Sequence, residues 1–271
     1  MSMHIKGVVF DWAGTIVDFG SLAPMGAFVI LFERHGIQIS IAQARIPMGL
    51  PKIDHIRVLG NLPEVAAQWH ALKGRPFDES DAHKLLAEFE PMSAQAALEH
   101  SDFIPGLLDT QAWLQKNGMR VATTTGYTRK IMTPLIAMAQ ERGFATERVV
   151  CCDDVERSRP DPMGMMLCMQ TLELSSTPWR VVKVDDTAPG LAEGLNAGCW
   201  TVGVASSGNA LGWSLAQWQQ ASESERDIAL ASAMEQLRKA GAHEVVSSVA
   251  DLPMALAKLE IRIASGERPQ P

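Results

Sequence analysis

The chain has 271 residues, of which 46% are hydrophobic and 20% are charged, as in an ordinary globular protein with one large or two smaller domains. The net charge of −7 argues against nucleic acid or an anionic membrane surface as a partner. No apolar run reaches the length of a membrane span and the N-terminal stretch lacks signal-peptide character, so we expect a cytoplasmic protein.

The first predicted element is a strand over residues 5–11, "IKGVVFD", in which an apolar run ends in an acid. A long stretch of helical pattern follows, punctuated by Pro, Gly and Ser, with helices predicted over residues 24–36, 40–48, 52–60, 63–74 and 78–100. A helical block inserted after the first strand predicts a second domain. We therefore expect an α/β domain formed by residues 1–20 and 101–271, and a helical domain formed by residues 21–100.

The rest of the chain alternates between apolar strand patterns and helical patterns. Strands are predicted over residues 120–126, 148–154, 181–186 and 200–206, with a weaker one over residues 243–248. Helical patterns fill residues 105–118 and 128–143 between them. Continuous apolar strands that alternate with helices predict an α/β fold with a doubly wound parallel sheet.

Polar residues stand where these strands end. They are Asp11, Thr125, Gly126, Arg157, Arg159, Asp185 and Asp186. Ligands of open parallel sheets bind at this edge, so these side chains are expected to form one site. The carboxylates suit Mg²⁺, and a hydroxyl, a backbone amide and an arginine suit phosphate oxygens. Each residue also has an ordinary structural explanation, as a helix cap, a strand former or a surface charge.

The order of the motifs "DWAGT", "TTTG", "RPDP" and "VDDT" resembles that of the haloacid dehalogenase superfamily of phosphoryl-transfer enzymes. The resemblance implies a Rossmann-like core with the helical block as its cap domain. It also implies that Asp11 attacks phosphorus and forms an aspartyl-phosphate. In this superfamily a second acid two positions after the nucleophile usually protonates the leaving oxygen, but this chain has Ala13 there.

The helical block contains "PMGLPKIDHI", in which Lys52 and His55 lie three positions apart on one face of a predicted helix. A lysine in an apolar pocket has a lowered pKa and attacks carbonyls as a neutral amine. The alternative is a surface lysine at a helix start. The motif resembles a carbon–phosphorus-cleaving branch of the superfamily, which converts phosphonoacetaldehyde to acetaldehyde and phosphate through a lysine Schiff base. A protonated imine accepts electrons, so carbon leaves as an enamine and no acid is needed at Ala13.

The resemblance implies a role for each matching residue. Asp11 would be the nucleophile and a Mg²⁺ ligand, together with Asp186 and the backbone carbonyl of Ala13. Lys52 would form the imine and His55 would assist its proton transfers. The implied substrate and phosphate holders are Met48, Gly49, Thr125, Gly126, Tyr127 and Arg159.

Two positions depart from the family pattern. Gly190 stands where the fourth motif often has a second acid, and either Asp185 or Glu193 is expected to replace it. Ser21 stands where relatives carry cysteine, so it would either hydrogen-bond in the closed site or cap a helix.

Other functions are compatible with parts of this pattern. A haloacid dehalogenase-type phosphatase or phosphomutase acting on a small phosphorylated metabolite would need the acid that Ala13 lacks. A dehalogenase would not need the Asp185–Asp186 pair, and an inactive binding module would not need an intact set of motifs. The resemblance also suggests a homodimer through the helical block. The apolar run over residues 25–32 would form either the dimer contact or the core of the block.

Overall fold

The computed structural model describes residues 3–270 and contains a six-stranded sheet in which every paired strand is parallel. The sheet order is β3-β2-β1-β4-β5-β6. The strands are β1 (Gly7–Phe10), β2 (Arg120–Thr124), β3 (Val149–Val150), β4 (Val181–Asp185), β5 (Trp200–Val204) and β6 (Glu244–Val246). Phe10 lies beside Thr123 and Val184, so β1, β2 and β4 end at the same edge. The predicted α/β fold with a doubly wound parallel sheet is confirmed.

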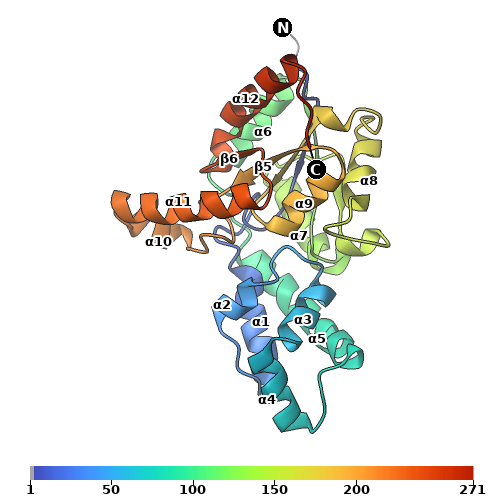
Figure 1. The fold of residues 1–271 in the computed structure, drawn as a ribbon, viewed down its shortest axis with the longest axis vertical. Helices are drawn as coiled ribbons and strands as arrows, with labels where there is room; N and C mark the ends of the chain where they lie inside the picture. The colour runs from blue at the N-terminus through green and yellow to red at the C-terminus, as the bar shows by residue number, and fades with distance from the viewer. Residues whose placement is uncertain (1–2, 271) are drawn as a thin grey trace.

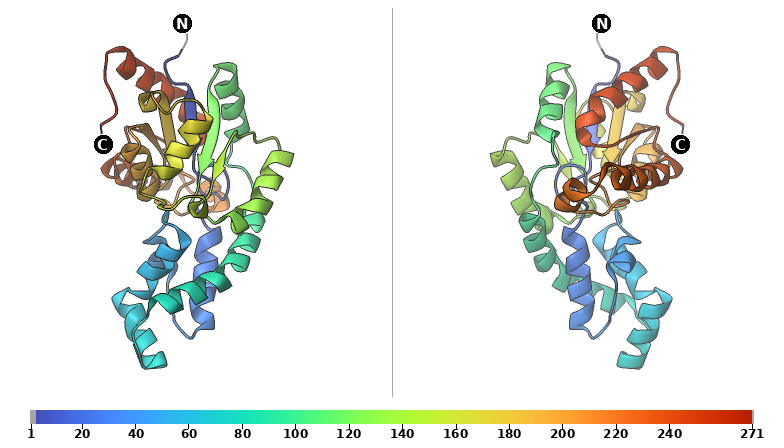
Figure 2. Two further views of the ribbon diagram at one scale, coloured as in Figure 1. Left: turned by 90° about the vertical axis from the view of Figure 1, so that its right-hand side faces the viewer. Right: turned by 90° about the vertical axis from the view of Figure 1, so that its left-hand side faces the viewer.

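Helices cover both faces of the sheet (Figures 1 and 2). Val8 and Phe10 point into a core shared with α6 (Leu107–Lys116), α7 (Arg129–Glu141) and α12 (Leu252–Ala264). Val9 points to the other face, against α8 (Met163–Thr171). This alternation is the period of a strand, and both faces are apolar because both are covered. Within residues 3–270 no helix has the length and apolar character needed to cross a membrane. A cytoplasmic location stays a prediction.

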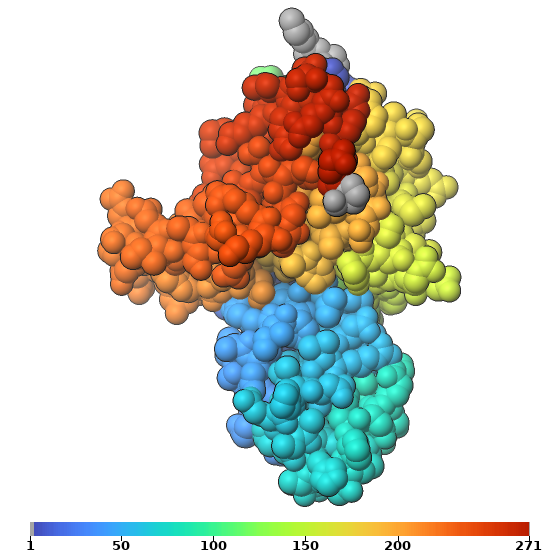
Figure 3. All heavy atoms as spheres, in the orientation of Figure 1, coloured from blue at the N-terminus to red at the C-terminus, as the bar shows by residue number. Residues whose placement is uncertain are grey.

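A block of helices lies beyond the carboxyl edge of the sheet and forms a separate lobe (Figure 3). Its helices are α1 (Ala23–Arg34), α2 (Ile41–Arg45), α3 (Lys52–Gly60), α4 (Pro63–Lys73) and α5 (Glu79–Glu99). Within the run 25–32, Phe28 and Leu31 are fully buried, whereas Ile30 is 47% exposed. Most of this run therefore supplies the core of the block, and only its outer face is open to a partner.

The structure differs from the sequence prediction in several places, and the helices α8, α9 (Ala188–Asn196) and α12 were not among the predicted elements. The third strand is shorter than predicted, because Asp154 accepts a hydrogen bond from the Cys151 amide (2.7 Å) and residues 152–154 turn into a 3-10 helix. The hairpin of α10 (Leu215–Gln220) and α11 (Glu223–Lys239) was not predicted. Its sequence is too polar for a clear apolar stripe, and its starts are set by the capping residues Ser214 and Ser222.

Candidate active site

Three carboxylates meet at the carboxyl edge of the sheet, where β1 and β4 end. Asp11 is 5% exposed, Asp185 is fully buried and Asp186 is 1% exposed. Oxygen atoms of the three lie within 4.8 Å of one another. Burial raises the pKa of Asp11 to about 6, with the charge of Asp185 adding to the rise and Arg159 opposing it. Burial and the neighbouring carboxylates raise the pKa of Asp186 well above its usual range.

This cluster has the chemistry of a site for a divalent cation. Its donors are all oxygen atoms, and their repulsion is relieved by a positive ion. Asp185 already has partners, since its Oδ1 accepts from the Thr187 amide (2.9 Å) and its Oδ2 lies 3.1 Å from the Lys183 ammonium. Asp186 accepts hydrogen bonds but forms no ion pair with any of residues 3–270, which leaves it better suited to ligate a metal.

Ser21 belongs to this site. Its Oγ donates to Asp186 Oδ2 at 3.1 Å, while the side chain of Asp18 accepts from the amides of Leu22 and Ala23 at the start of α1. The helix is therefore capped by Asp18, and Ser21 takes the hydrogen-bonding alternative of the two left open by the sequence. Asp18 was not among the predicted site residues, although it turns the chain at a φ of 60° and is 4% exposed.

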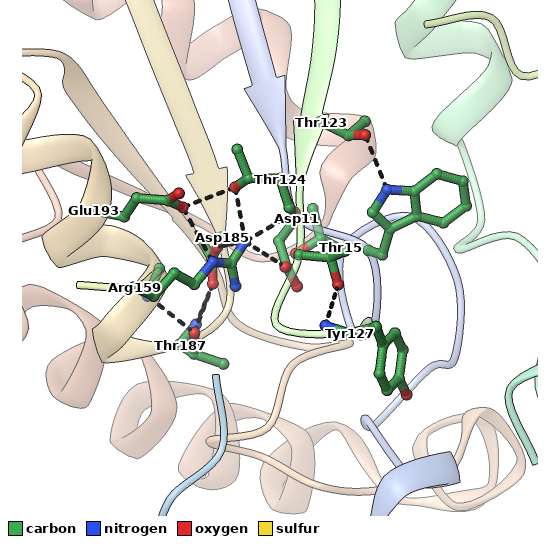
Figure 4. Close-up of polar contacts among 12 residues, drawn as sticks. Asp11, Thr15, Thr123, Thr124, Tyr127, Arg159, Asp185, Thr187 and Glu193 are labelled. Carbon is green, nitrogen blue, oxygen red and sulfur yellow. Dashed lines mark hydrogen bonds and ion pairs between the residues drawn. The ribbon is translucent and has the colours of Figure 1, made fainter. Parts of the chain in front are cut away.

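Arg159 lies beside Asp11 and is 3% exposed (Figure 4). Its Nη2 is 2.8 Å from Asp11 Oδ1, and its Nε is 3.0 Å from Glu193 Oε2. Arg157 does not join the site, because it is exposed and pairs with Asp161 instead (2.7 Å). A guanidinium held at Asp11 is placed to bind an anionic group that approaches this carboxylate.

Packing explains why Gly190 carries no acid, whereas the role of Asp185 or Glu193 in its place stays a prediction. A Cβ at Gly190 would lie 1.9 Å from Asp185 Oδ2, so no acid fits there while Asp185 keeps its place. Glu193 follows three residues later on α9 (Ala188–Asn196), is 2% exposed, and accepts hydrogen bonds from Arg159 and from the Thr124 hydroxyl (2.7 Å). Glu193 therefore supplies the buried acid on this helix.

The loop before α3 closes directly on the sheet edge. A Cβ at Gly126 would lie 2.8 Å from the Leu50 carbonyl oxygen, and one at Gly49 would lie 2.4 Å from Thr187 Oγ1. Gly49 also has a φ of +91°. Thr125 Oγ1 accepts a hydrogen bond from the Tyr127 amide (3.1 Å). The pocket between loop and sheet is lined by Asp11, Ala13, Pro24, Met48, Gly49, Lys52, Thr125, Gly126, Tyr127, Arg159 and Thr187.

Lys52 enters this pocket from the helical block. It is the first residue of α3, yet it is only 3% exposed, so the alternative of a surface lysine is wrong. Its ammonium lies 4.8 Å from the ring centre of Tyr127 and 5.8 Å from that of Phe28. Burial lowers the pKa of Lys52 to about 8. A useful fraction of this lysine is therefore a neutral amine near pH 7.

His55 lies behind Lys52 and does not line the pocket. Its ring is fully buried and stacks on Phe28 with 3.9 Å between ring centres. Nε2 lies 2.9 Å from the Ala44 carbonyl oxygen and donates to it, and Nδ1 has no hydrogen-bond partner among the described residues. Burial and the Lys52 charge lower the pKa of His55 well below its usual range. His55 is therefore a neutral imidazole with a free lone pair.

Most of the chain matches known proteins. The family model of haloacid dehalogenase-like hydrolases matches residues 5–198. Phosphonoacetaldehyde hydrolase of Paraburkholderia phytofirmans is 43% identical over 98% of this chain and 99% of that protein. The enzyme of the same name from Vibrio cholerae is 42% identical over 99% of this chain and its own full length. The chain belongs to the haloacid dehalogenase-like hydrolases, in the family of these phosphonoacetaldehyde hydrolases.

Solved structures support the same placement of this hydrolase. A phosphonoacetaldehyde hydrolase-like protein of Oleispira antarctica superposes with a TM-score of 0.96 at 38% identity, over 99% of this chain and 98% of its own. A β-phosphoglucomutase of Clostridium difficile superposes with a TM-score of 0.70 at 16% identity, which is a likeness of fold alone.

Besides Asp18, sequence reasoning missed Lys183 and Thr124 of the hydrolase site. Lys183 is fully buried in β4, and its ammonium donates to Thr124 Oγ1 at 2.6 Å. Thr124 in turn accepts from Arg159 at 2.8 Å. A lysine in the middle of the apolar strand "VVKVDD" was the available signal, because a charge is rarely buried there without a partner.

Proposed function

We propose that the chain hydrolyses the carbon–phosphorus bond of phosphonoacetaldehyde to acetaldehyde and phosphate. We further propose that residues 21–100 act as a cap domain on a core formed by residues 1–20 and 101–271. The observation that supports this best is the pairing of two different groups in one pocket. Asp11 and Arg159 reach it from the sheet, and the buried Lys52 reaches it from the helical block.

The aldehyde is the part of the substrate that Lys52 would bind. The neutral amine attacks the aldehyde carbon, and loss of water gives an imine that is protonated on nitrogen. His55 would assist the proton transfers of these steps through its unpaired Nδ1. Met48, Gly49 and Tyr127 line the space around the amine and would hold the two-carbon chain.

The phosphonate is the part that the sheet edge would bind. Thr125, the Gly126 amide and Arg159 would hold its oxygens while Asp11 attacks phosphorus. The carbon–phosphorus electrons then move into the protonated imine and leave an enamine on Lys52 and an aspartyl-phosphate on Asp11. Water hydrolyses the aspartyl-phosphate, and protonation of the enamine carbon followed by imine hydrolysis releases acetaldehyde.

We propose Mg²⁺ as the cofactor, with Asp11, Asp186 and the Ala13 carbonyl as protein ligands. The ion would supply positive charge beside the phosphonate oxygens and the three carboxylates. Asp185 and Ser21 would hold Asp186 in place without binding the ion. Ser21 hydrogen-bonds to Asp186, and Asp185 lies beside it in the cluster.

The direct test of this function is phosphate release from phosphonoacetaldehyde. With Mg²⁺ we expect turnover, and an excess of chelator should abolish it, because the carboxylates then repel the phosphonate. Added Mg²⁺ should restore the rate. Turnover that is unchanged by chelator would contradict the metal, and failure to release phosphate while simple phosphate esters are hydrolysed would favour the phosphatase alternative.

Ala13 tests why the usual second acid is missing. Ala13→Asp should slow phosphonate cleavage by roughly tenfold or more, because a carboxylate in this pocket would raise the Lys52 pKa by about one unit. The same variant should gain weak hydrolysis of a phosphate ester, for which a general acid contributes roughly 10²–10⁴-fold. Both substrates should be assayed with both proteins. Faster phosphonate cleavage by Ala13→Asp would refute the explanation.

We also propose that the chain forms a homodimer through the helical block. The open part of the run 25–32 carries Ile30, which is 47% exposed on α1. An exposed branched apolar side chain on the outer face of a helix is a suitable centre for such a contact. A monomeric mass in equilibrium sedimentation at micromolar concentration would contradict this proposal.

A further inference from the structure

Lys183 is a fully buried charge near the middle of the sheet. A buried ammonium is costly unless it is paired and hydrogen-bonded. Its Nζ donates to Thr124 Oγ1 at 2.6 Å and lies 3.1 Å from Asp185 Oδ2 and 3.5 Å from Glu193 Oε2. Lys183 does not line the pocket that contains Asp11 and Lys52, so it does not touch the space proposed for the substrate.

Arg159 shares all three partners of Lys183. Its guanidinium lies 3.0 Å from Glu193 Oε2, 2.8 Å from Thr124 Oγ1 and 3.5 Å from Asp185 Oδ2. Figure 4 shows Arg159 between Glu193, Thr124 and Asp11. Two cations and two carboxylates thus surround one hydroxyl, and only Arg159 also reaches Asp11.

Three glycines pack directly against the side chains of this network. A Cβ at Gly194 would lie 2.5 Å from the Lys183 Cβ, one at Gly164 would lie 2.5 Å from Glu193 Oε1, and one at Gly190 would lie 1.9 Å from Asp185 Oδ2. The two helices that carry these glycines, α8 and α9, therefore press directly on three members of the network. Such packing leaves the charged groups little freedom to rearrange.

We propose that Lys183 is a positioning residue that aims Arg159 at Asp11. Without Lys183, the carboxylates of Glu193 and Asp185 have Arg159 as their remaining cation, and they draw its guanidinium away from Asp11. With Lys183 present, both carboxylates are already paired, and the Nη2 group stays directed at the position of the phosphonate. This inference rests on the proposed function, because it assumes that Arg159 holds the phosphorus end of the substrate.

Lys183→Met is the main test, since it removes the charge and keeps an unbranched chain. We expect kcat/KM for phosphonoacetaldehyde to fall about 10²-fold, as for a displaced positioning group. Orthophosphate, measured by calorimetry, should also bind more weakly. Borohydride trapping of acetaldehyde on Lys52 should stay at the parent level, because that aldehyde has no phosphorus for Arg159 to hold. Lys116→Met, an exposed lysine on α6, is the matched control and should behave like the parent.

The results for Lys183→Met distinguish a positioning role of Lys183 from a structural one. Equal loss of trapping and of phosphate binding would assign Lys183 a merely structural role. Parent-like kcat/KM and phosphate affinity would overturn the proposal outright. If the parent itself does not cleave phosphonoacetaldehyde, the proposed function fails. Phosphate binding by Lys183→Met then still tests whether Lys183 orients the Arg159 guanidinium toward Asp11.

Thr124→Val keeps the proposal testable if Lys183→Met does not fold, and a double variant adds a second test if it does. Thr124→Val removes the shared hydroxyl, with its hydrogen bonds to Arg159, Lys183 and Glu193, and leaves the charge unchanged. Phosphate affinity should fall about tenfold, because Arg159 loses one of the hydrogen bonds that orient it. Combining Lys183→Met with Glu193→Gln removes one buried charge of each sign. Glu193 then no longer draws Arg159 away from Asp11. The kcat/KM of the double variant should therefore be at least about tenfold higher than that of Lys183→Met, a typical coupling for residues in contact. No weakening by Thr124→Val, or no recovery in the double variant, would refute the positioning role.

Discussion

Replacing Asp11 with asparagine is expected to lower kcat for phosphonoacetaldehyde by about 10⁴-fold or more, on the scale of other covalent nucleophiles. The amide has nearly the same shape, so the buried site keeps its packing, but a neutral amide does not attack phosphorus. The Asp11 pKa of about 6 leaves the carboxylate mostly ionised at pH 7 in the parent protein. Phosphate release under saturating substrate measures the loss.

Two controls make the Asp11 result specific. Rapid acid quench of the parent should capture a phosphoenzyme on Asp11, and the Asp11→Asn variant should capture none. Borohydride trapping on Lys52 should persist in Asp11→Asn, because imine formation precedes the attack on phosphorus. A variant that keeps more than about one hundredth of the parent kcat would show that Asp11 is a ligand rather than the nucleophile.

Replacing Lys52 with arginine is expected to abolish cleavage of phosphonoacetaldehyde. Arginine keeps the positive charge between Tyr127 and Phe28, but its guanidinium stays protonated and does not attack an aldehyde. The Lys52 pKa of about 8 means that about a tenth of the parent protein carries the neutral amine at pH 7. The comparison of kcat for the two proteins at pH 7 and pH 8 is the measurement.

The same pKa gives the sign of the pH dependence. Lowering the pH protonates more of Lys52, so the rate of imine formation should fall about tenfold per unit below pH 8 and level off above it. Asp11→Asn should show a profile of the same shape in a trapping assay, displaced toward lower pH, because the Asp11 charge raises the pKa of Lys52 in the parent. A rate of trapping that rises with falling pH would contradict the neutral amine as the attacking group.

The parts of the site that follow from local sequence could be predicted. Parallel strands end at one edge, so the positions of Asp11, Thr125 and Asp186 followed from strand pattern alone. The resemblance to a family then pointed to Lys52, and the structure places it in the same pocket. The strand pattern also gave the fold class, because continuous apolar runs require a sheet covered on both faces.

Contacts between distant segments could not be predicted. Arg45 reaches from α2 to the Gly20 and Gly212 carbonyl oxygens at 3.0 and 3.1 Å, which requires knowing how the helical block sits on the sheet. The absence of an acid at Gly190 is explained by the Asp185 carboxylate, which fills the space that a side chain there would need. The partners of Lys183 likewise come from three separate elements, although its place in an apolar strand was a signal of a buried charge.

Covalent trapping shows whether Lys52 and Asp11 act together on one substrate molecule. The protein should be incubated with phosphonoacetaldehyde and borohydride, digested and examined by mass spectrometry. We predict a reduced two-carbon adduct on Lys52 in the peptide that contains "MGLPKIDHI", with phosphorus retained on the adduct in Asp11→Asn and lost in the parent. An adduct confined to another lysine, or phosphorus lost equally from both proteins, would contradict the account.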